Sequence, residues 1–156
     1  NTFKRSGAAL ISLVLLLVLA VSAGAASSQN VGVKFWKERS DKESMANSGI
    51  DPDRTATLTR QANGTYTLTL PVMQVSKLGV TGYLSGLTIG DVTYDGTLAG
   101  DFNKATAVLT IKNLPASVFT GSDVNKSVLV TCNIQMDLQV LGEINTSARM
   151  CIWNQK

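Results

Sequence analysis

The sequence predicts an all-β domain, an antiparallel sandwich or barrel of about eight short strands. Three observations support this fold class. Beyond its N-terminal segment, the chain repeatedly alternates apolar and polar residues with the period of two that half-buried strands require. Turn-forming residues separate these runs at short intervals. None of the runs has the period of an amphipathic helix.

The clearest pair of strands is a hairpin over residues 54–60 and 65–75. The apolar residues of "RTATLTR" fall on one face, and "TYTLTLPVMQV" alternates in the same way. Between the two runs, the Asn63-Gly64 dipeptide supplies the positive φ angles that a tight hairpin turn needs. Pro71 cannot donate a hydrogen bond to a strand ladder, so we expect an edge or a bulge there.

The remaining strands follow from the same alternation. We expect them in the segments 31–37, 80–96 (a glycine-punctuated pair), 104–112, 127–136 and 146–153. The polar segment 41–48, "DKESMANS", does not alternate and is long enough for one 3-10 turn. This segment contains a methionine, Met45, although methionine prefers the protein core to a polar connection.

The N-terminus has the pattern of a secretory signal peptide. Lys4 and Arg5 precede a long uncharged apolar run, and small residues in an A-x-A arrangement end at Ala25. The apolar run is short for a helix that spans a bilayer. We therefore assign 1–25 as a signal peptide, with an uncleaved anchor as the alternative, and 26–156 as a single exported domain without a membrane span.

Composition excludes several classes of function. The formal net charge is +3, and removing the two N-terminal cations leaves +1, without any Lys/Arg cluster that would indicate a nucleic-acid partner. Histidine is absent, which removes the most common general base and metal ligand. The carboxylates do not cluster in a catalytic or calcium-binding spacing. We therefore expect no enzymatic activity.

Several short motifs together resemble the NEAT (near-iron-transporter) domain family, exported haem-binding modules of Gram-positive bacteria. In order, these are an aromatic strand followed by "KESMAN", a Thr-rich strand, "NGTYTLTL" and "GVTGYL". The closing "SARMCIW" is similar to the last strand of clostridial members, so the resemblance is to a divergent member of that type. It covers residues 31 to 153, and the Ser-Met-Ala turn is its most specific part.

The resemblance implies a fold, a ligand and a site. The family has an immunoglobulin-like β-sandwich that binds haem between the 3-10 turn and the last β-hairpin. Ser44 would hydrogen-bond a haem propionate, and Met45 would pack on the porphyrin. Leu138, Val140 and Ile144, in the hairpin, would form the facing wall. The implied function is capture or relay of haem at the cell surface or in the medium, together with other surface haem-relay proteins.

The sequence departs from the family in its iron ligand. Haem-binding members use a tyrosine in a Y-x-x-x-Y pattern on the last strand, whereas the tyrosines here are Tyr66, Tyr83 and Tyr94. The candidates left for haem iron are the thioether of Met150, facing Met45, and the thiol of Cys151. Because neighbouring residues of a strand face opposite ways, at most one of Met150 and Cys151 faces the pocket.

Each of these residues also has an ordinary structural interpretation. Met45 would equally plug the end of the sandwich, and Ser44 would cap the turn through a backbone N–H. Met150 is more ordinary as a core residue. The apolar residues of 137–145 would be explained equally by a longer hairpin with one buried face.

The two cysteines, Cys132 and Cys151, are candidates for a disulfide because the domain is exported. If the loop of the last hairpin is 137–145, position 132 lies nearly opposite 150 or 151, and a cross-strand bond is geometrically allowed. The sequence leaves the bonded and free alternatives open.

Two other functions remain in competition with haem capture. The first is a NEAT-like domain that has lost haem and serves in surface adhesion or protein interaction, which the missing tyrosines favour. The second is a structural envelope domain held by an uncleaved signal.

Overall fold

The computed structural model describes residues 27–77, 79–137 and 142–155. The strands are β1 (Ser27–Lys37), β2 (Ala56–Arg60), β3 (Tyr66–Pro71), β4 (Val75–Lys77), β5 (Val80–Ile89), β6 (Val92–Ala99), β7 (Val108–Leu114), β8 (Val128–Met136) and β9 (Glu143–Asn154). Short 3-10 helices lie in the connections, namely η1 (Met45–Gly49), η2 (Phe102–Lys104), η3 (Ala116–Val118) and η4 (Val124–Lys126).

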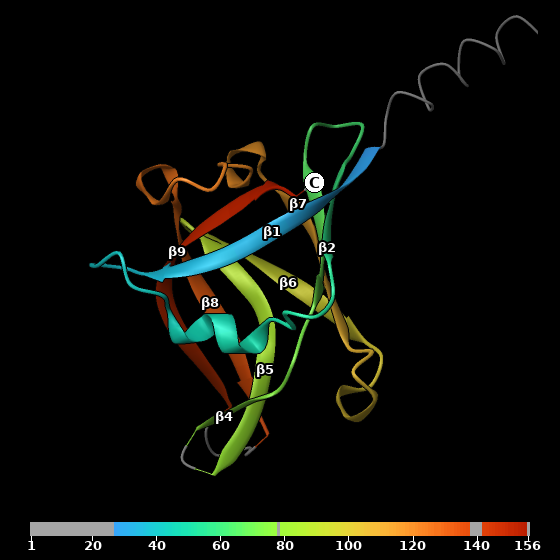
Figure 1. Cartoon of the computed structure of the whole chain (residues 1–156), viewed down its shortest axis with the longest axis vertical. Helices are drawn as coiled ribbons and strands as arrows, with labels where there is room; N and C mark the ends of the chain where they lie inside the picture. The colour runs from blue at the N-terminus through green and yellow to red at the C-terminus, as the bar shows by residue number, and fades with distance from the viewer. Residues whose placement is uncertain (1–26, 78, 138–141, 156) are drawn as a thin grey trace, which may run out of the picture.

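All strand pairings are antiparallel, and eight of the nine strands form a closed sheet (Figure 1). The strand order is β5-β6-β7-β3-β2-β1-β9-β8, and β8 pairs back onto β5. β4 adds a short ninth strand alongside the beginning of β5. The all-β antiparallel sandwich of about eight strands that the sequence predicts is thereby confirmed.

The hydrophobic core follows the predicted alternation. In the β2–β3 hairpin, Leu58 and Leu68 lie opposite each other, and both are fully buried. The predicted turn between them is present, and Gly64 has a positive φ of 86°. Pro71 is the last residue of β3 and lies beyond the last rung with β2, so that ladder does not need its missing N–H. Apolar burial on the inner face of the closed sheet supplies the main stabilisation.

Three expectations about the elements need comment. The strand predicted at 104–112 begins at Val108, because Lys104 ends η2 and Ala105 adopts a left-handed φ of 54°. The single predicted 3-10 turn is present as η1, but the described residues contain four such helices. The signal peptide predicted for residues 1–25 lies outside the described residues.

Among the residues that the structure describes, no helix is long and apolar enough to cross a membrane.

Candidate functional site: a groove between η1 and the β8–β9 hairpin

An apolar groove lies between η1 and the hairpin of β8 and β9. Its volume is about 170 Å³. The residues that line it are Met45, Ala46, Ser48, Val75, Ser76, Ile134, Met136, Ile144 and Thr146. They come from η1, β4, β8 and β9, and none of them is charged. The groove thus occupies the place that the resemblance predicted, between the 3-10 turn and the last hairpin.

Asn47 holds η1 in place at the edge of β1. β2 pairs with β1 only as far as Val31, so the later part of β1 has no strand neighbour on that side. There the Phe35 N–H donates to Asn47 Oδ1 at 2.8 Å, and Asn47 Nδ2 donates to the Phe35 carbonyl at 2.7 Å and to the Ser44 carbonyl at 2.9 Å. One carboxamide therefore replaces a strand rung and fixes the wall of the groove.

Ser44 is the N-cap of η1, as its ordinary interpretation predicted. Its Oγ accepts a hydrogen bond from the Ala46 N–H at 3.1 Å, and the residue is buried. Ser44 does not line the groove, whereas Ser48, one turn later, does. The assignment of Ser44 as the propionate anchor stays a prediction that this groove does not support, because Ser44 is not among its lining residues.

Met45 is a residue of the groove and not a plug of the sandwich. Its side chain is 72% exposed and contributes to the lining. It is the first residue of η1, next to the capping Ser44, so the cap fixes its backbone while the thioether stays free. A flexible, polarizable side chain in this position suits contact with an apolar ligand.

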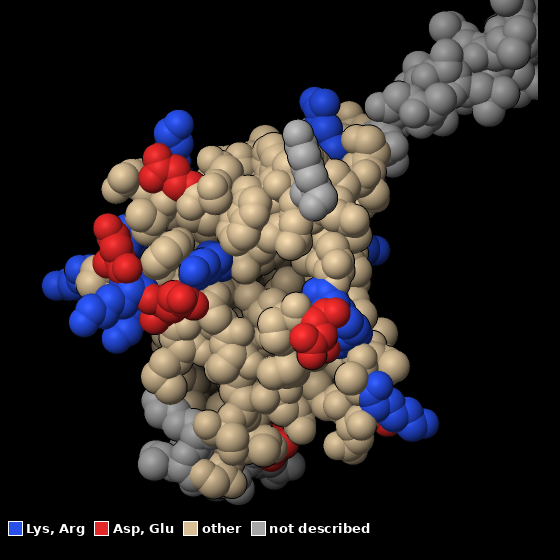
Figure 2. Space-filling model, in the orientation of Figure 1, with Lys and Arg blue, Asp and Glu red and all other residues tan. Residues whose placement is uncertain are grey.

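Arg149 joins β9 to the loop that leads into η1. Its guanidinium donates to the Lys37 carbonyl at 2.9 Å and to the Ser40 carbonyl at 2.7 Å, and it pairs with Asp41 at 2.8 Å. Figure 2 shows many of the charged atoms of that face gathered on the left, where β1 ends and this loop begins. The charges thus lie beside the groove, and the groove itself stays apolar.

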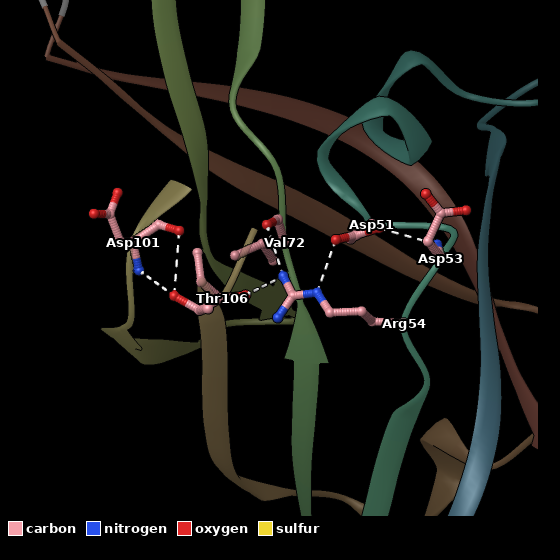
Figure 3. A network of polar contacts seen from close by, with 7 residues as sticks. Asp51, Asp53, Arg54, Val72, Asp101 and Thr106 are labelled. Carbon is pink, nitrogen blue, oxygen red and sulfur yellow. Dashed lines mark hydrogen bonds and ion pairs between the residues drawn. The ribbon is translucent and has the colours of Figure 1, made fainter. Parts of the chain in front are cut away.

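A second polar network secures the far end of η1 (Figure 3). Arg54 Nε donates to Asp51 Oδ2 at 2.8 Å, and its Nη2 donates to the Ala107 carbonyl at 2.7 Å. The hydrogen bond from Arg54, followed by that from the Asp53 N–H, holds the pKa of Asp51 below its usual value. The Asp51 N–H donates to the Pro71 carbonyl at 3.0 Å, which ties the end of the turn to β3.

Met136 is one of the groove residues that sequence reasoning missed. It is the last residue of β8, opposite Gly82 of β5, and only 4% of it is exposed. A Cβ on Gly82 would lie 2.7 Å from the Met136 sulfur and 2.6 Å from the Gln135 carbonyl oxygen, which is too close for any side chain. Gly82 therefore leaves the notch that the thioether occupies. The alternation of residues 127–136 predicts that Met136 faces inward, but nothing in the sequence indicates that it lies at the groove.

Met150 does not line the groove, so the structure gives no support to its assignment as a ligand of haem iron. It is fully buried in the hydrophobic core, opposite Phe35 on β1 and Val128 on β8. It faces the same way as Ile144 and Thr146, which do line the groove, but it lies further along β9. The alternation of the strand thus predicted correctly that Met150 faces inward. Its position further along β9, however, places it in the core and outside the groove.

Of the two alternatives that the sequence left open, the structure has the free one, since Cys132 and Cys151 are both unbonded and buried. The hairpin register explains why the two cysteines do not meet. Cys132 lies opposite Thr146, whereas the sequence placed it opposite residue 150 or 151. Met150 lies opposite Val128, four residues before Cys132 on β8. Cys151 pairs with Lys34 of β1, and its thiol contacts the Asp123 carbonyl at 3.5 Å. Burial raises the pKa of Cys132 to about 12, so its thiol stays protonated at neutral pH.

The remaining predicted residues divide into two groups. Ile144 lines the groove opposite Ile134, as expected for the hairpin wall. Leu138 and Val140 lie outside the described residues. Ser76 and Thr146 add hydroxyls to the lining, and neither carried a sequence signal beyond the alternation of its strand.

The described lining of the groove has the chemistry of a binding site for an apolar ligand. It offers apolar surface, three hydroxyls and two thioethers, and no lining residue is a general acid or base. Its volume is smaller than the roughly 300–1,000 Å³ of a pocket that encloses a whole cofactor. The described walls therefore suit one part of an apolar molecule.

Comparison with known proteins agrees with this architecture. No protein-family model and no curated protein matches the chain. A solved mutant of the NEAT5 domain of IsdX2, in complex with haem, aligns with a TM-score of 0.51 and 12% identity over 83% of this chain and 97% of that one. The NEAT5 domain of IsdX2, a B. anthracis hemophore in complex with haem, aligns at 0.48 with 11% identity over 83% and 98%. The chain has the β-sandwich fold of a NEAT domain.

Proposed function

We propose that this protein is an exported module that binds haem or a related tetrapyrrole and acts in haem capture or relay, without catalysis. The observation that carries the proposal is the apolar, uncharged groove between η1 and the β8–β9 hairpin. A flat porphyrin needs an apolar slot with two walls, and Met45 and Ile144 lie on these two walls. The signal-like N-terminus supports action at the cell surface or in the medium.

The described residues fit such a ligand in three respects. The lining is mainly apolar, hydroxyls of Ser48, Ser76 and Thr146 are available for polar groups at the ligand's edge, and the notch at Gly82 gives the Met136 sulfur its place at the groove. Bound haem would supply the iron that the protein carries. The protein's own residues would hold the ligand, exclude water from one face and release it to a partner.

A protein-interaction module that has lost haem is the second candidate. The observation in its favour is the absence of tyrosine from β9, where only Ile144 and Thr146 line the groove. The same groove would then accept an apolar side chain of a protein partner.

A haem titration of the full chain, followed by absorption, separates these two functions. Capture predicts a Soret band that shifts and sharpens to saturation. Replacing Ile144 with Asp places a charge on the apolar wall and should weaken binding by on the order of tenfold or more, because an unpaired charge is expensive to desolvate. Leu129→Asp is the matched control, since Leu129 is on the same hairpin, 57% exposed, and outside the groove.

An unchanged Soret band in the wild-type protein would refute haem capture and favour the interaction module. Equal loss of binding in the Ile144 and Leu129 variants would show that this groove is not the haem site.

A further inference from the structure

The four methionines of the chain differ in their exposure to solvent. Met45 is 72% exposed and Met73 is 38% exposed, whereas Met136 and Met150 are buried. Of the large apolar side chains that the structure describes, Met45 is the most exposed. It lines the groove, and Met73 does not. The most accessible thioether of the described chain thus lies on the wall of the candidate site.

Access decides how readily a methionine sulfur reacts with a peroxide, because the neutral thioether is itself the nucleophile and needs no general base. A lone pair of the sulfur attacks one oxygen of hydrogen peroxide, and the O–O bond breaks. The sulfur is oxidised to the sulfoxide, and the other oxygen leaves with both peroxide protons as water. The reaction turns a flexible apolar side chain into a polar one. An exposed thioether is therefore modified long before a buried one.

Oxidation of Met45 would leave η1 in place, because other groups hold this turn. Ser44 Oγ accepts from the Ala46 N–H at 3.1 Å, and Asn47 Nδ2 donates to the Phe35 carbonyl at 2.7 Å. The Met45 side chain takes part in none of these hydrogen bonds and is not packed in the core. An added oxygen therefore changes the surface of the groove and not the fold that carries it.

A sulfoxide at position 45 is unfavourable for an apolar ligand in the groove. In the free protein, water hydrates the new S=O group, and a ligand seated on this wall would displace that water. A buried acceptor without a donor costs free energy. The hydroxyl on the same turn, Ser48 Oγ, already donates to the Met45 carbonyl at 2.7 Å. The ligand would therefore bind more weakly once the sulfur is oxidised.

We infer that Met45 is a site of oxidative modification by peroxide, and that its sulfoxide lowers the affinity of the groove for its ligand. This inference rests on the proposed function and adds regulation by oxidants to it. Burial protects Met136 and Met150 from the same reaction, so the protein releases its ligand before oxidation reaches the core. The change is reversible, since thiol-dependent methionine sulfoxide reductases restore the thioether.

The first stage of the test locates the reaction on the full chain. Protein without ligand is treated with a limiting amount of hydrogen peroxide, catalase removes the remainder, and peptide mapping by mass spectrometry follows each methionine. We expect Met45 to be oxidised first and Met73 more slowly, with Met136 and Met150 unchanged. The midpoint of urea unfolding should be the same before and after oxidation.

The second stage measures affinity for two probes, haem and iron-free protoporphyrin IX, before and after peroxide treatment. Oxidation should weaken the binding of both on the order of tenfold, because the altered contact is with the ring and not with iron. Met45→Leu replaces the thioether with an apolar side chain of similar volume, so peroxide should no longer change its affinity. Met73→Leu is the matched control and should remain as sensitive as wild type.

Three results would overturn the inference while haem capture stands: oxidation of another methionine before Met45, equal affinity before and after oxidation of Met45, or a loss of affinity that accompanies a lower urea midpoint. If the untreated protein bound neither haem nor protoporphyrin, the proposed function would fail, and this inference with it.

Discussion

Replacing Asn47 with alanine should loosen the η1 wall of the groove and destabilise the domain. The side chain makes three hydrogen bonds of 2.7 to 2.9 Å, two of them to the backbone of Phe35, which is 1% exposed. Net contributions near 1 kcal/mol per bond, together with the desolvation of the Phe35 N–H, give a loss of about 2–4 kcal/mol in the free energy of unfolding.

Equilibrium urea unfolding of the full chain, followed by tryptophan fluorescence, measures this loss. The midpoint should fall while the slope m stays the same, because the substitution leaves the area exposed on unfolding nearly unchanged. Ser48→Ala is the control, since Ser48 is exposed and makes a single hydrogen bond to the Met45 carbonyl. It should change the free energy by less than about 0.5 kcal/mol. If Asn47→Ala costs no more than Ser48→Ala, then packing and the backbone hydrogen bonds, such as that from the Ser44 N–H to the Phe35 carbonyl, hold η1 without Asn47.

Three further predictions concern other parts of the fold. Gly82→Ala forces a Cβ against the Gln135 carbonyl oxygen and should lower the free energy of unfolding by about 1–3 kcal/mol in the same assay. The control Gly49→Ala places its Cβ at an ordinary 3.5 Å from Val75 and should be close to neutral. Similar losses in the two variants would show that the close contact at Gly82 is not the cause. The pKa of the Cys132 thiol is raised from 9.0 to about 12 in the folded protein, so the stability that the neutral thiol contributes is complete below pH 9 and is lost as pH rises towards 12. Cys132→Ala should flatten this alkaline decline in the free energy of unfolding. An unchanged dependence of that free energy on pH would exclude the thiol as its source. Because the pKa of Asp51 is lowered in the folded protein, the stability that its carboxylate contributes is present above pH 4 and is lost as pH falls through the folded-state pKa. Asp51→Asn should therefore reduce the fall in the free energy of unfolding at acid pH. A variant whose free energy of unfolding falls as in the wild type would refute this.

Local patterns in the sequence were sufficient for the fold class and for most strands. The Asn63-Gly64 turn and the period of two around Leu58 and Leu68 defined a hairpin that the structure confirms. The polar segment around Met45 was correctly separated from the strands as a 3-10 turn. These features depend on interactions between near neighbours in the chain, which a single sequence displays directly.

The site required information about long-range register that the sequence does not display. An error of four residues in the β8–β9 pairing preserves the face of every side chain but changes its partner. For this reason Met150 was correctly placed on the inner face and wrongly placed at the groove, and Met136 was overlooked. The closing pair of β5 with β8, which brings Gly82 beside Met136, has no local signal at all.

The position of β9 has a consequence for how the chain must assemble. This last strand is twelve residues long and pairs with β1, the first strand, on one side and with β8 on the other. During synthesis, β1 emerges long before its partner β9, so the ring of strands stays open until β9 has left the ribosome. Folding dominated by such distant pairings is slow, and truncation before β9 would leave two long strands with unsatisfied edges, ready to associate with other chains.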